Sequence, residues 1–142
     1  MKKTRELLDD KGTTVWSVSP TDSVYNALSL MAEKNIGAVI VMKQERMVGI
    51  LSERDFARKT VLQDRTAKNM QASEIMTSRP VCVRPDQTIE ECMALMTEKR
   101  VRHLPVVEED RVVGLVSIGD VVKATISQQK FIIKQLEQYI SG

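Results

Sequence analysis

The chain has 142 residues, a net charge of +2 and 42% hydrophobic residues, enough for one domain or two half-domains that share a core. The small charge gives no sign of a polyanion partner, and 4% aromatic residues argue against a base-stacking surface for nucleic acid. The residues after Met1 do not resemble a secretory signal, and no apolar run is long enough for a membrane helix. We therefore expect a cytoplasmic protein with neither a nucleic-acid nor a membrane partner.

The two cysteines and the single histidine give no sign of a metal centre. Cys82 and Cys92 lack a metal-ligand or redox spacing, so we expect two small buried side chains in a reducing compartment. A zinc site built from several histidines is excluded because His103 is the only one.

The first half of the chain predicts helices and strands in alternation. A turn with a helix N-cap is expected at Pro20-Thr21-Asp22. The apolar residues that follow it are spaced as on one face of a helix, which predicts the main helix of this half. Short apolar runs mark buried strands. We predict a short helix over 4–9 that Gly12 ends, a strand over 13–18, a helix over 23–34, strands over 38–42 and 47–51, and a helix from Ser52 to about 61.

The second half repeats the first without a gap. Pro85 corresponds to Pro20, and Val113-Gly114 corresponds to Val48-Gly49, at a constant offset. Such regularity indicates internal duplication of a β-α-β-β-α unit. We place the first repeat at 10–62, a linker at 63–75 that ends in a short helical turn, the second repeat at 76–126, and a C-terminal extension at 127–142.

The extension continues a long helix that is predicted from Ile118 to about Ile140. Apolar residues persist past the end of the repeat, at Phe131, Ile132, Ile133, Leu136, Tyr139 and Ile140. The helix either folds back on its own module or packs against another subunit. We favour the second alternative, because an apolar stripe of this length is unusual on a monomer.

The same strand-to-helix junction occurs in both repeats, at Val48–Phe56 and at Val113–Val121. Each junction joins an apolar strand to a helix that begins after a serine, with an aspartate three residues later. Backbone N–H groups, a hydroxyl and a carboxylate therefore meet at one place. Such groups can hold the ribose and phosphate of a nucleotide.

These paired Gly-x-x-Ser-x-x-Asp units, together with the segment Arg102-His103-Leu104-Pro105-Val106-Val107, resemble a CBS-domain pair, or Bateman module, of the small standalone type. The resemblance covers about residues 10–126. It implies an α/β fold in which two tandem repeats pack with pseudo-twofold symmetry. It also implies a regulatory module that binds an adenosine-containing nucleotide (AMP, ATP, NAD or S-adenosylmethionine) in a cleft between the repeats. A homodimer and an unidentified protein effector are the partners that it suggests.

The resemblance assigns ribose binding to Asp55 and Asp120, and an ionised carboxylate can accept two hydrogen bonds from a cis-diol. Ser52 and Ser117 either contact the ribose or phosphate or serve only as N-caps. By the same resemblance, adenine lies near Thr14, Trp16, Ile36, Gly37 and Ala38 in one repeat, and near Arg79, Val81, Val101, Arg102 and His103 in the other.

Phosphate groups would meet Arg102 and His103, whose counterparts in the first repeat are the uncharged Gly37 and Ala38. Arg54 and Arg58 are the compensating candidates in the first repeat. In the second repeat Gly119 replaces Arg54, which leaves room but no charge. We therefore expect two unequal sites.

Two other functions remain open. The chain could be a structural dimerisation module without a ligand, or an enzyme that acts on nucleotides. The sequence contains no P-loop and no Cys-His or Ser-His arrangement, so we expect no enzymatic activity, no catalytic residue and no catalytic cofactor.

Overall fold

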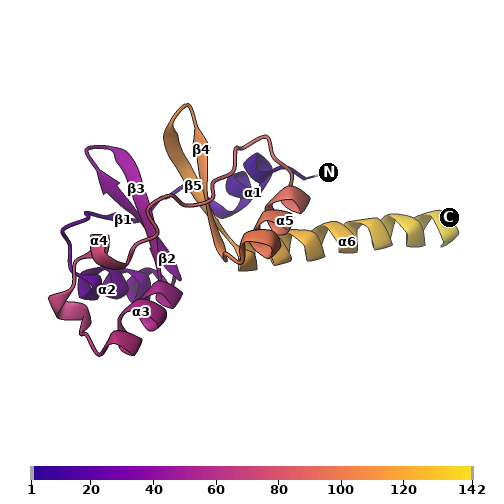
Figure 1. The fold of residues 1–142 in the computed structure, drawn as a ribbon. Coiled ribbons are helices and arrows are strands. Elements are labelled where there is room, and N and C mark those ends of the chain that lie inside the picture. The colour runs from indigo at the N-terminus through magenta and orange to yellow at the C-terminus, as the bar shows by residue number, and fades with distance from the viewer. Residues whose placement is uncertain (1, 142) are drawn as a thin grey trace. The chain divides into compact units, whose positions relative to one another are not determined.

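The computed structural model describes residues 2–141, and its contacts divide the chain into two compact units. The α3 unit comprises residues 14–80 and 109–112. The α6 unit comprises residues 1–13, 81–108 and 113–142. Figure 1 labels their helices and strands. Within the part of the chain described, no helix is long and apolar enough to cross a membrane.

The α3 unit is built on a three-stranded sheet of β1 (Ser17–Val18), β2 (Ala38–Lys43) and β3 (Arg46–Ser52). Strand β1 runs parallel to β2, and β2 runs antiparallel to β3, with Ala38 opposite Ser52. Gln44 and Glu45 both have positive φ, the conformation of a two-residue hairpin turn whose twist matches the strands. The unit also contains α2 (Val24–Lys34), α3 (Glu53–Lys59), 3-10 turns at Val61–Gln63 and Ala67–Asn69, and α4 (Ala72–Ile75).

Apolar side chains of α2, β2 and β3 form the core of this unit, together with residues of the predicted linker. Met70, Ala72 and Ile75 are almost fully buried. The backbone N–H of Val24 donates to the carbonyl of Met70, and that of Ala72 donates to the carbonyl of Asp22. The segment after α3 is thus held against the start of α2.

The α6 unit contains α1 (Thr4–Lys11), α5 (Ile89–Lys99), the paired strands β4 (His103–Glu108) and β5 (Arg111–Ser117), and α6 (Ile118–Ser141). The first strand of the second repeat is reduced to a parallel bridge between Val83 and Val106. The core is aliphatic and includes Leu7 and Leu8 of α1 beside residues of α5, β4, β5 and α6.

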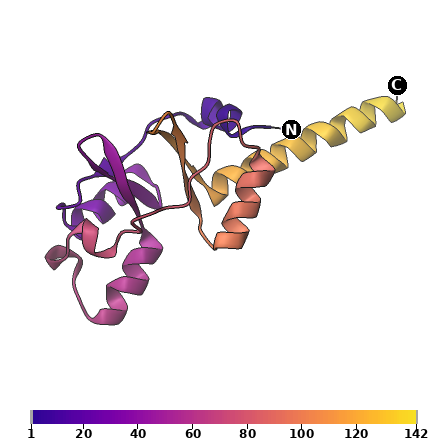
Figure 2. The same ribbon diagram turned by 45° about the horizontal axis from the view of Figure 1, so that its top comes forward.

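Helix α1 packs on the second repeat, although it comes first in the sequence. The N–H of Thr4 donates to the carbonyl of Gln87 at 2.8 Å, and Lys3 forms a β-bridge with Thr88. Leu8 lies so close to Gly114 that a Cβ atom at position 114 would be 2.6 Å from Leu8 Cδ2. Figure 2 shows α1 beside the first turns of α6.

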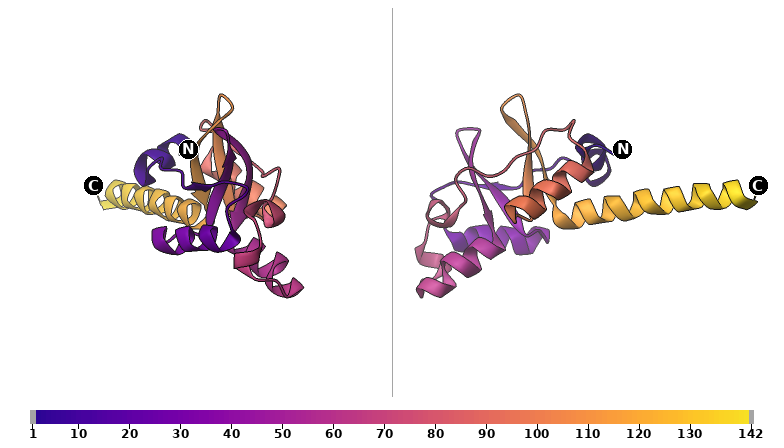
Figure 3. Two further views of the ribbon diagram at one scale, coloured as in Figure 1. Left: turned by 90° about the vertical axis from the view of Figure 1, so that its left-hand side faces the viewer. Right: turned by 45° about the vertical axis from the view of Figure 1, so that its right-hand side comes forward.

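Only the first turns of α6 pack within its unit. Val121 and Ala124 are buried, whereas every residue from Phe131 to Ile140 is exposed. Figure 3 shows α6 continuing as one straight helix past α1 and α5. The helix therefore does not fold back on its own unit.

The predicted α/β fold and the long terminal helix are confirmed. Gly12 does end α1, with φ of 103°, but the strand expected over 13–18 is limited to Ser17–Val18. The N-cap of α2 is Ser23 rather than a residue of the preceding turn. Both cysteines are free, but only Cys92 is buried, so the expectation of two buried thiols is wrong for the partly exposed Cys82.

Candidate functional site

Asp55 lies at the start of α3, where it forms a reciprocal capping box with Ser52. Oδ2 of Asp55 accepts hydrogen bonds from the backbone N–H and the hydroxyl of Ser52, at 2.9 and 3.0 Å. Oγ of Ser52 accepts from the backbone N–H of Asp55 at 3.2 Å. The Lys59 ammonium lies 3.5 Å from the other oxygen, Oδ1, and donates to the carbonyl of Ile75. The predicted N-cap role of Ser52 is confirmed.

Gly37 and Trp16, two adenine candidates of the first repeat, lie at the same end of the sheet as this capping box. The carbonyl of Gly37 accepts from the N–H of Glu53 in the first turn of α3. The carbonyl of Trp16 accepts from the N–H of Ile40, one strand away. Trp16 is 37% exposed, and the ammonium of Lys34 lies 4.4 Å from its ring centroid. Its indole is therefore available as a stacking surface, with a positive charge on the ring.

The other first-repeat candidates differ in how far they reach solvent. Ala38 is fully buried, so its methyl group cannot contact a ligand. Thr14 and Arg58 are exposed, whereas Ile36 and Arg54 are partly buried. Ile36 packs against the core of the α3 unit, which gives it a structural role in any case.

Asp120 occupies the corresponding place at the start of α6, and its lysine partner comes from a different helix. Its Oδ2 accepts from the N–H of Ser117 at 2.8 Å, and Oγ of Ser117 accepts from the N–H of Asp120 at 3.1 Å. The ammonium of Lys11, at the end of α1, lies 2.6 Å from Oδ2 and donates to the carbonyl of Leu115. Among the described residues none donates to Oδ1, so that oxygen can accept further hydrogen bonds.

The environment of Asp120 keeps its carboxylate ionised. Burial alone raises the pKa of this carboxyl group, but the hydrogen bonds from Lys11 and from the backbone of Ser117, and the charge of Lys11, outweigh burial. The pKa of Asp120 is therefore lowered from its ordinary value of 3.8. At neutral pH the group is a charged acceptor, as binding of a diol requires.

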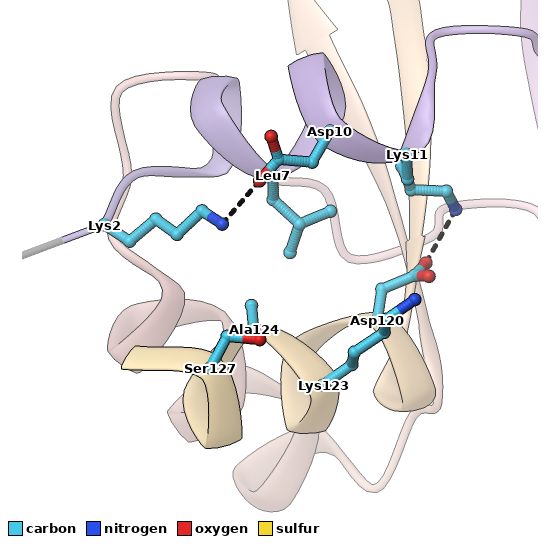
Figure 4. Close-up of a pocket in the computed structure, with 8 residues that line it drawn as sticks. All are labelled: Lys2, Leu7, Asp10, Lys11, Asp120, Lys123, Ala124 and Ser127. Carbon is cyan, nitrogen blue, oxygen red and sulfur yellow. Dashed lines mark hydrogen bonds and ion pairs between the residues drawn. The ribbon is translucent and has the colours of Figure 1, made fainter. Parts of the chain in front are cut away.

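A cavity of about 140 Å³ lies beside Asp120, between α1 and α6. Figure 4 shows Lys2, from the segment before α1, reaching toward Asp10, and Lys11, at the end of α1, reaching toward Asp120, while Lys123 of α6 also lines the cavity. Lys2 is paired with Asp10 at 2.6 Å. The lining therefore holds three lysines and two aspartates, and excess positive charge lies next to the carboxylate.

The remaining second-repeat candidates fall into two groups. Val81 and Val101 pack against the core of the α6 unit, so they offer at most one face to a ligand. Arg102 and Gly119 are exposed and His103 is partly buried. The carbonyl of Arg102 accepts from the N–H of Ile118, which places this residue beside the capping box. Arg79 is exposed and belongs to the α3 unit.

Sequence reasoning missed the lysines that accompany the two aspartates. Lys59 could have been found, because it is four residues after Asp55 on a predicted helix. Lys11 could not, because 109 residues separate it from Asp120. No cluster of three or more potential metal ligands exists among residues 2–141.

The geometry defines a class of protein: a duplicated α/β module whose repeats carry matching serine–aspartate capping boxes at helix N-termini. The CBS domain family model matches residues 12–61 and 72–127. The chain belongs to the CBS domain family and is a CBS domain pair, a type of regulatory module.

Individual relatives agree with this assignment. The chain is 37% identical over 136 residues to the mitochondrial CBS domain-containing protein CBSX3 of Arabidopsis thaliana, covering 92% of this chain and 66% of that protein. It resembles the crystal structure of the CBS domain protein NE2398, with a TM-score of 0.85 and 53% identity over 88% of this chain and 98% of that one.

A more distant structure carries ligands. The CBS domain pair of protein MJ0100, solved in complex with 5′-methylthioadenosine and S-adenosyl-L-methionine, has a TM-score of 0.80 and covers 90% of this chain and 98% of that one. At 20% identity this likeness shows a shared fold.

Proposed function

We propose that this chain is a sensor of adenosine-containing nucleotides, with Asp55 and Asp120 as the acceptors for ribose hydroxyls. The observation that carries the proposal is the Ser–Asp capping box, which recurs at the start of α3 and of α6. In each box the contacts with serine use Oδ2, so Oδ1 of Asp120 is left for a ligand, whereas Oδ1 of Asp55 is paired with the ammonium of Lys59 at 3.5 Å. Two hydrogen bonds from a cis-diol to an ionised carboxylate are strong because they are charge-assisted.

Other residues complete each site. In the first repeat Trp16 supplies a face for the base, with Thr14, Ile36 and the backbone of Gly37 and Ala38 nearby, while Arg54 and Arg58 attract phosphate. In the second repeat Arg102 and His103 attract phosphate, Ser117 positions Asp120, and Gly119 leaves space. Arg79, Val81 and Val101 border the base there. AMP, ATP and NAD fit this set, and the ligands of the MJ0100 pair contain the same adenosine.

The output of the sensor is a change in protein contacts rather than catalysis. A ligand shifts the module between two states only as far as it binds them differently. We propose a homodimer that signals to a protein effector. A related solved protein of the family, a CBS-CP12 protein that is 26% identical to this chain, is described as hexameric.

Isothermal titration of the full chain with adenosine, AMP, ATP, NAD and S-adenosylmethionine tests the proposal. We expect saturable binding of at least one nucleotide, and Trp16, the only tryptophan, adds a fluorescence signal from the first repeat. Asp120→Asn and Asp55→Asn should each weaken binding at their own site by about 1–3 kcal/mol. The matched control is Asp86→Asn, which removes an exposed carboxylate of a turn.

The outcomes separate the alternatives. No heat and no thermal shift with any of the five compounds would support a structural module instead. Conversion of a nucleotide, followed by chromatography after hours of incubation, would indicate an enzyme. Unchanged affinity in a folded Asp55→Asn/Asp120→Asn double variant would remove the assigned role of both carboxylates.

A further inference from the structure

The C-terminal part of α6 is a helix without packing partners in its own unit. Val121 and Ala124 are buried, but Ile132 is 49% exposed, Tyr139 86% and Ile140 82%. An isolated helix of about 15 residues is only marginally stable in water, even with residues that favour helix formation. The free-energy cost of forming the first turn is barely offset by the few hydrogen bonds that the following turns add. This segment therefore needs a partner to be stable.

The exposed apolar residues follow a heptad pattern along one side of α6. Spacings of four and three residues alternate along the stripe, which consists of the polar Gln129 and five apolar residues, Val122, Ile126, Ile133, Leu136 and Ile140. We call these six residues the α6 stripe. β-branched isoleucines recur every seven residues within it, as in the seam of a coiled coil. Ile132 and Tyr139 widen the apolar face on one flank.

Charges on the other flank favour one orientation of a partner helix. Lys130 and Glu137 occupy the same heptad position, seven residues apart. In an antiparallel pair of identical helices like positions face each other, so Lys130 would lie beside the partner's Glu137, and the reverse pair would form as well. In a parallel pair the same two residues would face Thr125 and Ile132 of the partner, which carry no charge.

We propose that the exposed part of α6 pairs antiparallel with α6 of a second copy of this chain, so that Ile133 packs against the partner's Leu136 and Gln129 lies level with the partner's Ile140. This register is centred between Lys134 and Gln135, midway between Gln129 and Ile140. The pair therefore covers the stripe from Gln129 to Ile140, while Val122 and Ile126 lie outside it. The inference rests on the proposed homodimer and assigns its interface.

Sedimentation equilibrium of the full chain at about 50 μM, well above the Kd of a stable dimer, tests the interface. We expect the mass of a dimer for the wild type and for Gln138→Asp, which places the same charge off the stripe. Leu136→Asp should give a monomer. A monomeric wild type would show that another protein covers the stripe, and a dimer that persists in Leu136→Asp would place the interface elsewhere; either result overturns the proposal.

Cysteine cross-linking tests the orientation. An equimolar mixture of Gln129→Cys and Ile140→Cys chains should form a disulfide-linked dimer under mild oxidation, whereas each variant alone should not. The wild type controls for Cys82 and Cys92. Cross-linking of Gln129→Cys with itself would show parallel helices and overturn the antiparallel register.

Nucleotide titration of Leu136→Asp separates this proposal from the sensor function. Both capping boxes lie outside the exposed segment, so the variant should bind nucleotide with an affinity within about twofold of the wild type. Loss of the dimer with retained binding supports the interface. Failure of the wild type to bind any nucleotide would refute the sensor function and leave the mass measurements valid.

Discussion

Lys11 at the end of α1 and Asp120 at the start of α6 form an ion pair in which Nζ lies 2.6 Å from Oδ2. The lysine thus links the first helix of the chain to the carboxylate that we assign to ribose. In the α3 unit Lys59 has a similar relationship to Asp55, at 3.5 Å. In both units the same ammonium group also donates to a backbone carbonyl, which fixes its position.

Replacing Lys11 with methionine should raise the pKa of Asp120. Burial already raises the pKa of this carboxyl group, and the substitution removes both the hydrogen bond and the charge that lower it. The carboxyl carbon of Asp120, followed by NMR over a pH titration, measures the change. Lys2→Met is the matched control, because Lys2 pairs with Asp10 instead. An unchanged Asp120 pKa in Lys11→Met would show that the ion pair does not persist in solution.

The stability of the chain should fall in acid partly through Asp120. Because its pKa is lower in the folded chain than in the unfolded chain, the ionised form favours folding. This contribution is complete above the unfolded value, ordinarily 3.8, and is lost as the pH falls through the folded value. Urea unfolding between pH 6 and about pH 3 should therefore show a shallower acid decline for Asp120→Asn than for the wild type. Parallel curves would contradict the linkage.

The glycines of the two junctions should tolerate alanine unequally. A Cβ atom at position 49 would lie 2.7 Å from the backbone oxygen of Thr77, which a bridge to Ile50 holds in place. At position 114 it would meet the side chain of Leu8 at 2.6 Å. Overpacking of this kind costs about 1–3 kcal/mol, and Gly49→Ala should lie at the upper end because backbone yields less readily than a side chain.

Denaturant unfolding measures both glycine variants. Shortening Leu8 should recover part of the stability that Gly114→Ala loses. The double variant Leu8→Ala/Gly114→Ala should therefore lose less stability than the sum of the losses in the two single variants. Strict additivity would show that Leu8 is not what limits position 114.

Thr60→Val should stabilise the chain. Thr60 is fully buried after α3, and its hydroxyl has no hydrogen-bond partner among the described residues. Valine has nearly the same shape and removes the unpaired group, so the free energy of unfolding should rise by about 1 kcal/mol. The exposed Thr66→Val is the control and should change stability by less than about 0.5 kcal/mol. A loss of stability in Thr60→Val would reveal a partner for the hydroxyl.

Arg102→Ala should reduce the preference for ligands with more phosphate groups. The residue is exposed beside the capping box of α6, and a guanidinium group binds phosphate through two parallel hydrogen bonds. The ratio of the ATP and adenosine affinities, measured by titration, should fall in the variant while adenosine affinity stays the same. An unchanged ratio would place the phosphate elsewhere.

Local spacing was enough to predict much of the molecule. Helices α2, α5 and α6, the hairpin strands and the N-cap at Ser52 follow from apolar periodicity and the residues that flank it. The duplication was visible because Gly, Ser and Asp recur at one offset. These features depend on residues that are close in the sequence.

Features that depend on distant residues were not predicted. The packing of α1 on the second repeat needs Leu8 to meet Gly114, and nothing near Leu8 encodes that contact. Strand β1 pairs over only two residues, although Thr13 to Val18 alternate as a strand should. Met70 and Ala72 are core residues in a stretch whose polar neighbours suggested a linker.

The position of α1 also affects how the chain folds as it is synthesised. Residues 14–80 can assemble soon after they emerge from the ribosome, whereas Leu7 and Leu8 must wait for β5 and α6, about a hundred residues later. During that interval two leucines remain without a core. A nascent-chain stall placed before β5 should therefore leave α1 open to protease, while the polypeptide from Thr14 onward already resists cleavage.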